Sequence, residues 1–269
     1  MNEDLLRTIS MRQNNEGDKT LLSPEDSKYK QAELMPAVEA QLEKMQKHPV
    51  VQKIEEILKD PKIQALKYHN RDHTIDVVKE AILMALYANE LVAKGEMDAS
   101  EEFTEKDLEM LALAAYAHDI GFLVDATKQL DKNKTGHEEV GAQLFLFQLA
   151  EGSNLTRQEV MVISEAIKAT EVKFDTSRGC LLQTQDPKNK IARVLMDADV
   201  ANFGREDRSD CTMRYAKELG ISDEKMSVFK QSTLSMMRNH SWQSVAGREL
   251  RESQKRLNII ALQSDIQSA

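Results

Sequence analysis

The sequence contains few cysteines, few aromatic residues and little glycine or proline. Among its 269 residues are two cysteines, ten glycines and five prolines, and 5% of the chain is aromatic. Two cysteines exclude a disulfide framework, and Cys180 and Cys211 cannot form a CxxC metal site, so we expect two reduced thiols. Alternating strand patterns bounded by turn residues are also nearly absent, and we therefore predict an all-α fold.

Long apolar runs and an excess of basic residues are missing too. No run approaches the roughly 18 apolar residues that indicate a membrane-spanning helix, and residues 1–4 show no basic region followed by an apolar stretch, as a signal peptide would. We expect a cytoplasmic protein with no membrane partner. The formal net charge of -9 argues against a broad surface for a nucleic-acid polymer. A small anionic substrate stays open, because a metal centre would supply local positive charge.

Helix signals begin near residue 23. Ser23 and Pro24 form a helix start, with a capping hydroxyl followed by proline at the first helical position. This helix is expected to end before Pro49, and Pro36 is a candidate break or kink within it. We predict a flexible extension over residues 1–22 and a single helical domain over residues 23–269.

Further helix starts follow along the chain. Thr104 and Thr156 each open a segment that resembles a capping box. Residues 172–188 carry no helical pattern, and we expect a long loop there, of the kind that often serves as a functional lid. An amphipathic helix is expected over residues 248–262.

The histidines lie in short clusters with acids or with each other. His69 and His73 stand four residues apart, so on a helix they would share a face and could point into one cavity. His118 and Asp119 follow the apolar run 111–117, which indicates a buried helix end. A buried histidine and acid are costly unless they pair or bind a metal ion. Each cluster alone also fits ordinary surface or core histidines, or a simple His–Asp hydrogen bond.

Two later clusters could complete such a site. His137 stands at another helix start, where a capping or surface histidine is the alternative. Asp197 and Asp199 interrupt a hydrophobic helix that leads to Asn202. At least one of these acids is expected to face a cavity or a partner charge, unless both lie on a solvated face. Imidazole and carboxylate groups are ligands for many divalent metal ions.

In combination, the clusters are far more specific than any one of them. Their order, H-N-x-x-H, H-D, H-E and A-D-x-x-N, resembles the HD-domain metal-dependent phosphohydrolases, and within that superfamily the branch that includes the cyclic-nucleotide phosphodiesterases. The residues that carry the likeness are YHNRDH at 68–73, AHDIG at 117–121 and ADVAN at 198–202. The resemblance implies an HD-domain helical bundle, here with N- and C-terminal helical extensions.

The resemblance also implies a set of metal ligands. His73, His118, Asp119 and Asp199 match the four protein ligands of the tightly held metal, with Asp197 as the competing acid. Asp119 would bridge to a second, mostly water-coordinated ion. We therefore expect two divalent metal ions as cofactors, and Mn, Fe, Ni, Zn and Mg all stay open.

Further roles around the metals follow from the same resemblance. His69 matches the histidine that acts as general acid on the leaving oxygen, and Asp119 is expected to act with it in catalysis. His137 matches a position that helps to place the second metal or the phosphate. Asn202 is expected to support the helix turn of Asp199 or the water network of the site.

We therefore predict a phosphohydrolase that cleaves a phosphate ester, with a nucleotide or a related small phosphodiester as substrate. Metal-activated hydroxide would attack phosphorus in line, and His69 would protonate the leaving group. The alternatives are a phosphomonoesterase or nucleotide triphosphohydrolase of the same superfamily, an HD-type di-iron oxygenase, and a non-catalytic regulatory protein. Ile120 and Gly121 stand where the phosphodiesterases have a histidine and a proline, which leaves the substrate open. A homodimer stays open as well.

Overall fold

Helices make up most of the structure. The computed structural model describes residues 21–121, 137–183 and 186–268. Within them lie eleven α-helices and a single two-stranded sheet, so the predicted all-α class is confirmed. The helices are α2 (Pro24–Gln46), α3 (Pro49–Leu58), α4 (Pro61–Gln64), α5 (Arg71–Ala93), α6 (Glu105–Ala117), α8 (His137–Leu144), α9 (Arg157–Ala169), α10 (Lys190–Asp199), α11 (Arg208–Glu218), α12 (Asp223–Asn239) and α13 (Val245–Ser268).

The predicted helix starts are confirmed where the structure describes them. The Ser23 hydroxyl accepts from the Asp26 backbone N–H and caps α2, and Thr104 and Thr156 open α6 and α9 with complete capping boxes. Pro36 does not end α2, which continues through it to Gln46. The extension predicted over residues 1–22 falls almost entirely outside the described residues, and the domain boundary at residue 23 stays a prediction.

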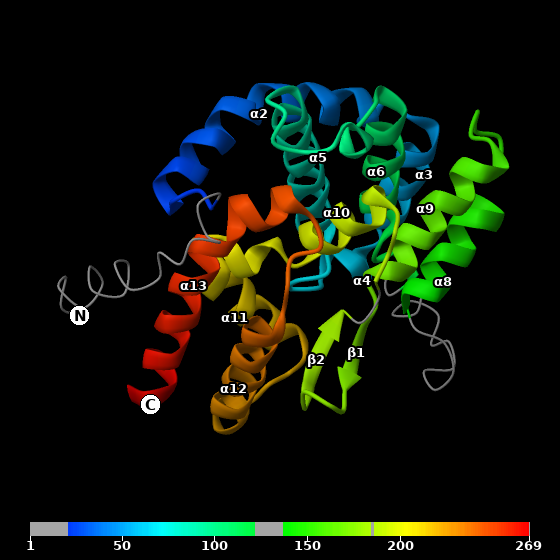
Figure 1. Ribbon diagram of the computed structural model, residues 1–269. Coiled ribbons are helices and arrows are strands. Elements are labelled where there is room, and N and C mark those ends of the chain that lie inside the picture. The colour runs from blue at the N-terminus through cyan, green and yellow to red at the C-terminus, as the bar shows by residue number, and fades with distance from the viewer. Residues whose placement is uncertain (1–20, 122–136, 184–185, 269) are drawn as a thin grey trace.

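Helices α5, α6 and α10 form the centre of the molecule (Figure 1). Helix α5 packs against α2, α6 and α10, and α6 also packs against α9. Every residue from Met110 to Ala117 in α6 is buried, which is the pattern of a helix surrounded by protein. Because α6 ends inside this core, His118 directly after it is buried and Asp119 is partly buried.

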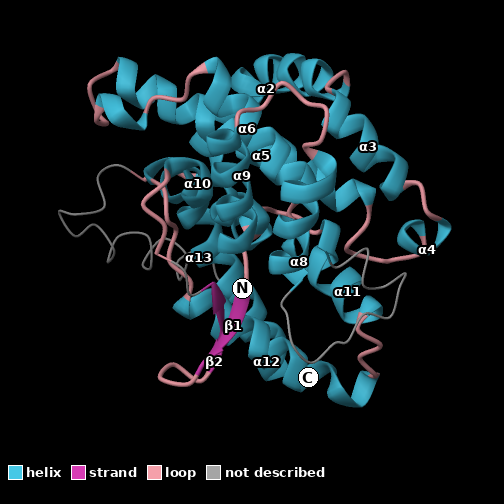
Figure 2. Cartoon of the chain, turned by 90° about the vertical axis from the view of Figure 1, so that its right-hand side faces the viewer, coloured by secondary structure: helices cyan, strands magenta, loops and turns pink. Residues whose placement is uncertain are grey.

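The loop predicted over residues 172–188 is wrong for its first two thirds. Strands β1 (Val172–Asp175) and β2 (Cys180–Gln183) pair antiparallel there, with Val172 opposite Gln183 (Figure 2). Cys180 and Leu182 are buried on one face, where β2 contacts α12, whereas Phe174 on β1 is 61% exposed. Four-residue strands with one exposed apolar face carry too little alternation to stand out in the sequence.

Helices α11, α12 and α13 and the short 3-10 helix η3 (Ala201–Gly204) form a C-terminal region beside the central helices. A Cβ on Gly204 would clash with the backbone of Arg251, so a glycine is required where η3 contacts α13. Arg251 itself is 2% exposed and donates to Glu80 on α5, with Nη2 2.6 Å from Oε2. This buried ion pair joins the C-terminal region to the core.

Two further expectations can be compared with the described residues. Cys180 and Cys211 are free and buried, in agreement with the predicted reduced thiols. Among the helices that the structure describes, none has the length and apolar character to span a membrane.

Candidate metal centre

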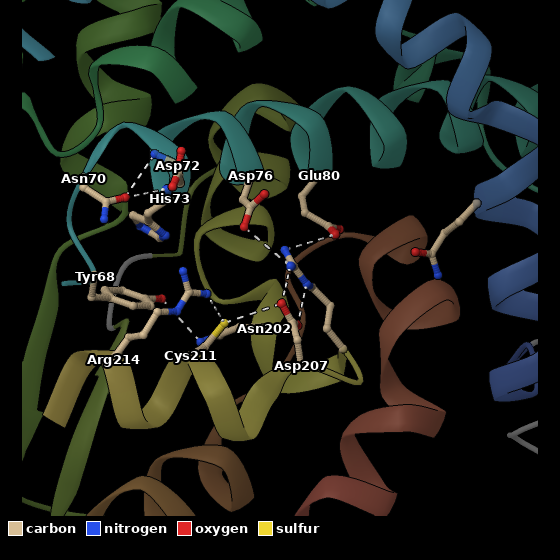
Figure 3. Close-up of polar contacts among 12 residues, drawn as sticks. Tyr68, Asn70, Asp72, His73, Asp76, Glu80, Asn202, Asp207, Cys211 and Arg214 are labelled. Carbon is tan, nitrogen blue, oxygen red and sulfur yellow. Dashed lines mark hydrogen bonds and ion pairs between the residues drawn. The ribbon is translucent and has the colours of Figure 1, made fainter. Parts of the chain in front are cut away.

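His73 lies in the first turn of α5. Asn70 caps this helix, since its side-chain oxygen accepts from the backbone N–H groups of Asp72 and His73 at 3.0 and 3.2 Å (Figure 3). The cap sets where the helix begins. It also directs the buried His73 ring toward α6, where Nε2 lies 3.3 Å from Oδ2 of Asp119.

His118 lies immediately after α6, and its ring is held by the backbone. Nδ1 lies 2.8 Å from the carbonyl oxygen of Ala115. A carbonyl can only accept, so Nδ1 carries the hydrogen and the neutral ring presents the lone pair of Nε2 to the site. That nitrogen lies 3.1 Å from Oδ2 of Asp119 and 3.5 Å from Oδ1 of Asp199.

His73, His118 and Asp119 form one cluster with potential ligand atoms within 4.8 Å of one another. Nε2 of His118 and Oδ2 of Asp119 are buried and have no hydrogen-bond partner among the described residues. Buried polar atoms normally have a partner, because leaving one unpaired is costly. Two imidazole nitrogens and a carboxylate oxygen form a donor set that suits a divalent ion. The residues present therefore fit a bound metal.

Asp199 lies beside this cluster and Asp197 does not. Oδ1 of Asp199 faces the histidines, while Oδ2 accepts from the Gln183 side chain at 3.2 Å. Asp197 is fully buried on the other side of α10, where it accepts from the backbone N–H groups of Gln243 and Ser244. The geometry thus favours Asp199 over Asp197 as a ligand, although its role as a ligand stays a prediction.

The electrostatics of the cluster favour a positive charge at its centre. Burial lowers the pKa of His118, but Asp119 and Asp199 outweigh burial and raise that pKa well above its ordinary value. Burial raises the pKa of Asp119, but His118 and His73 hold it well below its ordinary value. A divalent cation would satisfy the same carboxylates that a proton on His118 satisfies.

His69 does not lie on the same helix as His73. The helix begins at Arg71, so the expectation of a shared helical face is wrong, and His69 lies in the turn before the Asn70 cap. It remains close to the cluster, because the His69 and His73 rings are 5.8 Å apart at their centroids. The turn brings the two histidines together although regular helix does not connect them.

Glu218, at the end of α11, holds His69 in place. One carboxylate oxygen contacts His69 Nδ1, and the other accepts from the backbone N–H groups of Tyr68 and His69 at 2.7 and 3.0 Å. Burial lowers the pKa of His69, but Glu218 and the nearby Asp119 and Asp199 raise it above the ordinary value. Sequence reasoning missed Glu218, since it lies 149 residues from His69 and belongs to no motif.

The remaining predicted residues have different outcomes. Asn202 follows α10, and its side-chain amide donates to the Tyr68 hydroxyl at 3.3 Å. It lines the same cavity as His73 and Asp199. The backbone of His137 begins α8, but its side chain lies outside the described residues.

Comparison with known proteins identifies a family whose model matches this part of the chain. Residues 70–202 match the family model of the HD domain. The chain contains an HD domain. HD-domain proteins are in general metal-dependent hydrolases, and the cluster of His73, His118 and Asp119 fits that chemistry. Neither the curated proteins nor the solved structures that were compared give a match to this HD-domain chain.

Proposed function

We propose that this HD-domain protein is a metal-dependent phosphohydrolase that cleaves a phosphate ester of a nucleotide or a related small phosphodiester. The observation that supports it most is the convergence of buried ligand atoms that make no hydrogen bond: Nε2 of His118 and Oδ2 of Asp119, 3.1 Å apart, with Nε2 of His73 next to them. This convergence lies within the segment that matches the HD domain.

In this proposal, His73, His118, Asp119 and Asp199 would hold a divalent ion, and Asp119 would also serve a second one. Bound divalent ions of this kind lower the pKa of water and neutralise charge on phosphoryl oxygens. The protein contributes ligands that are fixed before binding. The Ala115 carbonyl fixes the His118 ring, and the Asn70 cap fixes the turn that carries His73.

His69 is the proposed general acid. Its Nδ1 contacts Glu218, and in this proposal Nε2 gives a proton to the leaving oxygen. Glu218 stabilises the protonated ring, because a carboxylate beside an imidazolium favours the charged form. A raised pKa extends to higher pH the range over which His69 carries the proton that a general acid needs.

Metal analysis and a panel of phosphoesters test the proposal, with Asp119→Ala and Asp210→Ala compared. Asp210 is exposed on α11 and serves as the matched control. We expect about two divalent ions per wild-type chain, and loss of both metal and hydrolysis only in Asp119→Ala. Turnover should fall about 10³-fold or more, since a catalytic metal supplies several kcal/mol to the transition state. Unchanged hydrolysis in Asp119→Ala would show the mechanism to be wrong.

The same measurements separate the other hydrolases and the oxygenase. Cleavage of monoesters alone would replace the diesterase with a phosphomonoesterase of the same superfamily. Release of triphosphate from a nucleotide would indicate a triphosphohydrolase. Stoichiometric iron with oxygen consumption, and no phosphoester cleavage, would indicate a di-iron oxygenase.

A further inference from the structure

Helix α11 contributes a guanidinium to the cavity beside the metal centre. Arg214 and Cys211 on this helix line the same cavity as His73, Asp199 and Asn202. Figure 3 shows the Arg214 guanidinium between Tyr68 and Cys211, on the side of the cavity opposite α5. Helix α11 lies outside residues 70–202, so Arg214 belongs to none of the motifs that identify the HD domain.

Arg214 forms no ion pair with a described residue, and Asp76 and Asp207 act on its charge only from farther away. Its one hydrogen bond to a described residue runs from Nη2 to the Cys211 sulfur at 3.2 Å, and no described carboxylate lies within 4.0 Å of it. Arg205, which lines the same cavity, differs in this respect. It donates to both carboxylate oxygens of Asp207, at 2.9 and 2.6 Å, and forms a longer ion pair with Asp76.

A neutral thiol is a weak acceptor for an arginine. Replacing it with an anion would therefore cost little and would give a half-buried charge its counter-charge. The planar fork of a guanidinium matches the oxygens of a phosphoryl group better than a lysine does. An anion in this cavity would meet Arg214 together with His73 and Asp199, which border the metal centre, and it would also face the Asp76 carboxylate.

We propose that Arg214 is a substrate-binding residue whose guanidinium holds a non-bridging oxygen of the phosphoryl group at the metal centre. This inference rests on the proposed function and specifies how that site recognises its substrate. In this arrangement α11 serves the site twice, since Glu218 orients the acid and Arg214 binds the phosphate.

Binding of inorganic phosphate to the manganese-loaded full chain tests the inference. Calorimetry should be run on wild type, Arg214→Gln, Arg214→Met and the control Arg178→Gln. The Arg178→Gln substitution also removes one positive charge, but Arg178 is exposed on the hairpin near Asp175. We expect phosphate affinity to fall about tenfold or more in both Arg214 variants, as for the loss of a hydrogen bond between charged groups. It should stay within about twofold in the control, with metal content unchanged in all four proteins.

Equal phosphate affinity in wild type and either folded Arg214 variant would overturn the inference. Arg214→Met keeps an apolar side chain of similar length, so phosphate affinity can still be measured on this variant if Arg214→Gln fails to fold. Hydrolysis assays on the same proteins separate the two proposals. If wild type cleaves phosphoesters and Arg214→Gln binds phosphate normally, only the inference about Arg214 is wrong. If wild type binds phosphate through Arg214 but cleaves no ester, the inference is supported and the proposed function is wrong.

Discussion

The helices that carry the candidate metal ligands and the C-terminal region build the same site in different ways. Helices α5, α6 and α10 pack directly on one another and bring His73, His118 and Asp199 together inside the core. Helix α11 reaches the site from the side, and its Glu218 holds the turn at Tyr68 and His69. The proposed ion site therefore depends on core packing, whereas the proposed proton donor depends on a contact between distant parts of the chain.

The largest effect that separates the two regions is expected from His69→Ala. Turnover should fall by about 10²- to 10⁴-fold, the usual loss when a general acid is removed, while metal content stays at the wild-type value. Steady-state kinetics and metal analysis on one preparation measure both. Loss of metal would show that His69 is a metal ligand, and the distinction between the ion site and the proton donor would then be wrong.

Arg251→Met tests the joint between the C-terminal region and the core. Removing Arg251 leaves Glu80 with only the longer ion pair to Arg205, at 3.8 Å, and the free energy of unfolding should fall by about 3 kcal/mol. The control is Lys28→Met, because the ion pair of Lys28 with Glu206 is 73% exposed on both sides. It should cost about 0.5 kcal/mol or less. Urea unfolding measures the free energy of unfolding of both variants. Similar decreases would show that the ion pair of Arg251 with Glu80 stabilises the protein no more than an exposed ion pair does.

Glu218→Gln should change the pH dependence of turnover. Glu218 raises the pKa of His69, so its neutral replacement should lower that pKa. The acid must be protonated to act, and activity is lost as pH rises through its pKa. The alkaline limb of kcat should therefore move to lower pH, with turnover near neutral pH reduced about tenfold.

Glu206→Gln is the matched control for this change, since Glu206 is exposed and far from the histidines in its contacts. Its pH profile should coincide with that of wild type. A Glu218→Gln profile with an unmoved alkaline limb would contradict the assignment of His69 as the acid that Glu218 orients.

Asn202→Ala should have the smallest effect. It removes a half-buried hydrogen bond to the Tyr68 hydroxyl, worth about 0.5–1.5 kcal/mol of unfolding free energy. Metal content should not change, because Asn202 lies outside the ligand cluster. Unfolding curves and metal analysis measure the two quantities, and a loss of metal would show that Asn202 supports the ligands directly.

Local signals in the sequence predicted the helix starts well. A threonine followed three residues later by an acid satisfies two backbone donors within one turn, so it identifies the starts of α6 and α9 without knowledge of the rest of the chain. The same local reasoning was wrong for His69, because spacing of four residues indicates a shared face only inside a helix. Asn70 begins the helix after His69 rather than before it.

Contacts between distant segments were beyond sequence reasoning. Asp197 and Asp199 are two residues apart, so on a helix they point in nearly opposite directions. The A-D-x-x-N motif favours Asp199, and the structure supplies the physical reason: Asp197 accepts from the backbone before α13, whereas Asp199 faces His118. Glu218 and Arg214 lie on a helix with no recognised motif, and packing alone brings them to the cavity.

The positions of the candidate ligands also have a thermodynamic consequence. Residues 73, 118 and 199 are far apart along the chain and close together only when α5, α6 and α10 are packed. An ion held by them would bind the folded chain and hardly the unfolded one. Each tenfold rise in free metal above its dissociation constant would then add about 1.4 kcal/mol to folding. The melting temperature would thus report occupancy of the site, even before any substrate is known.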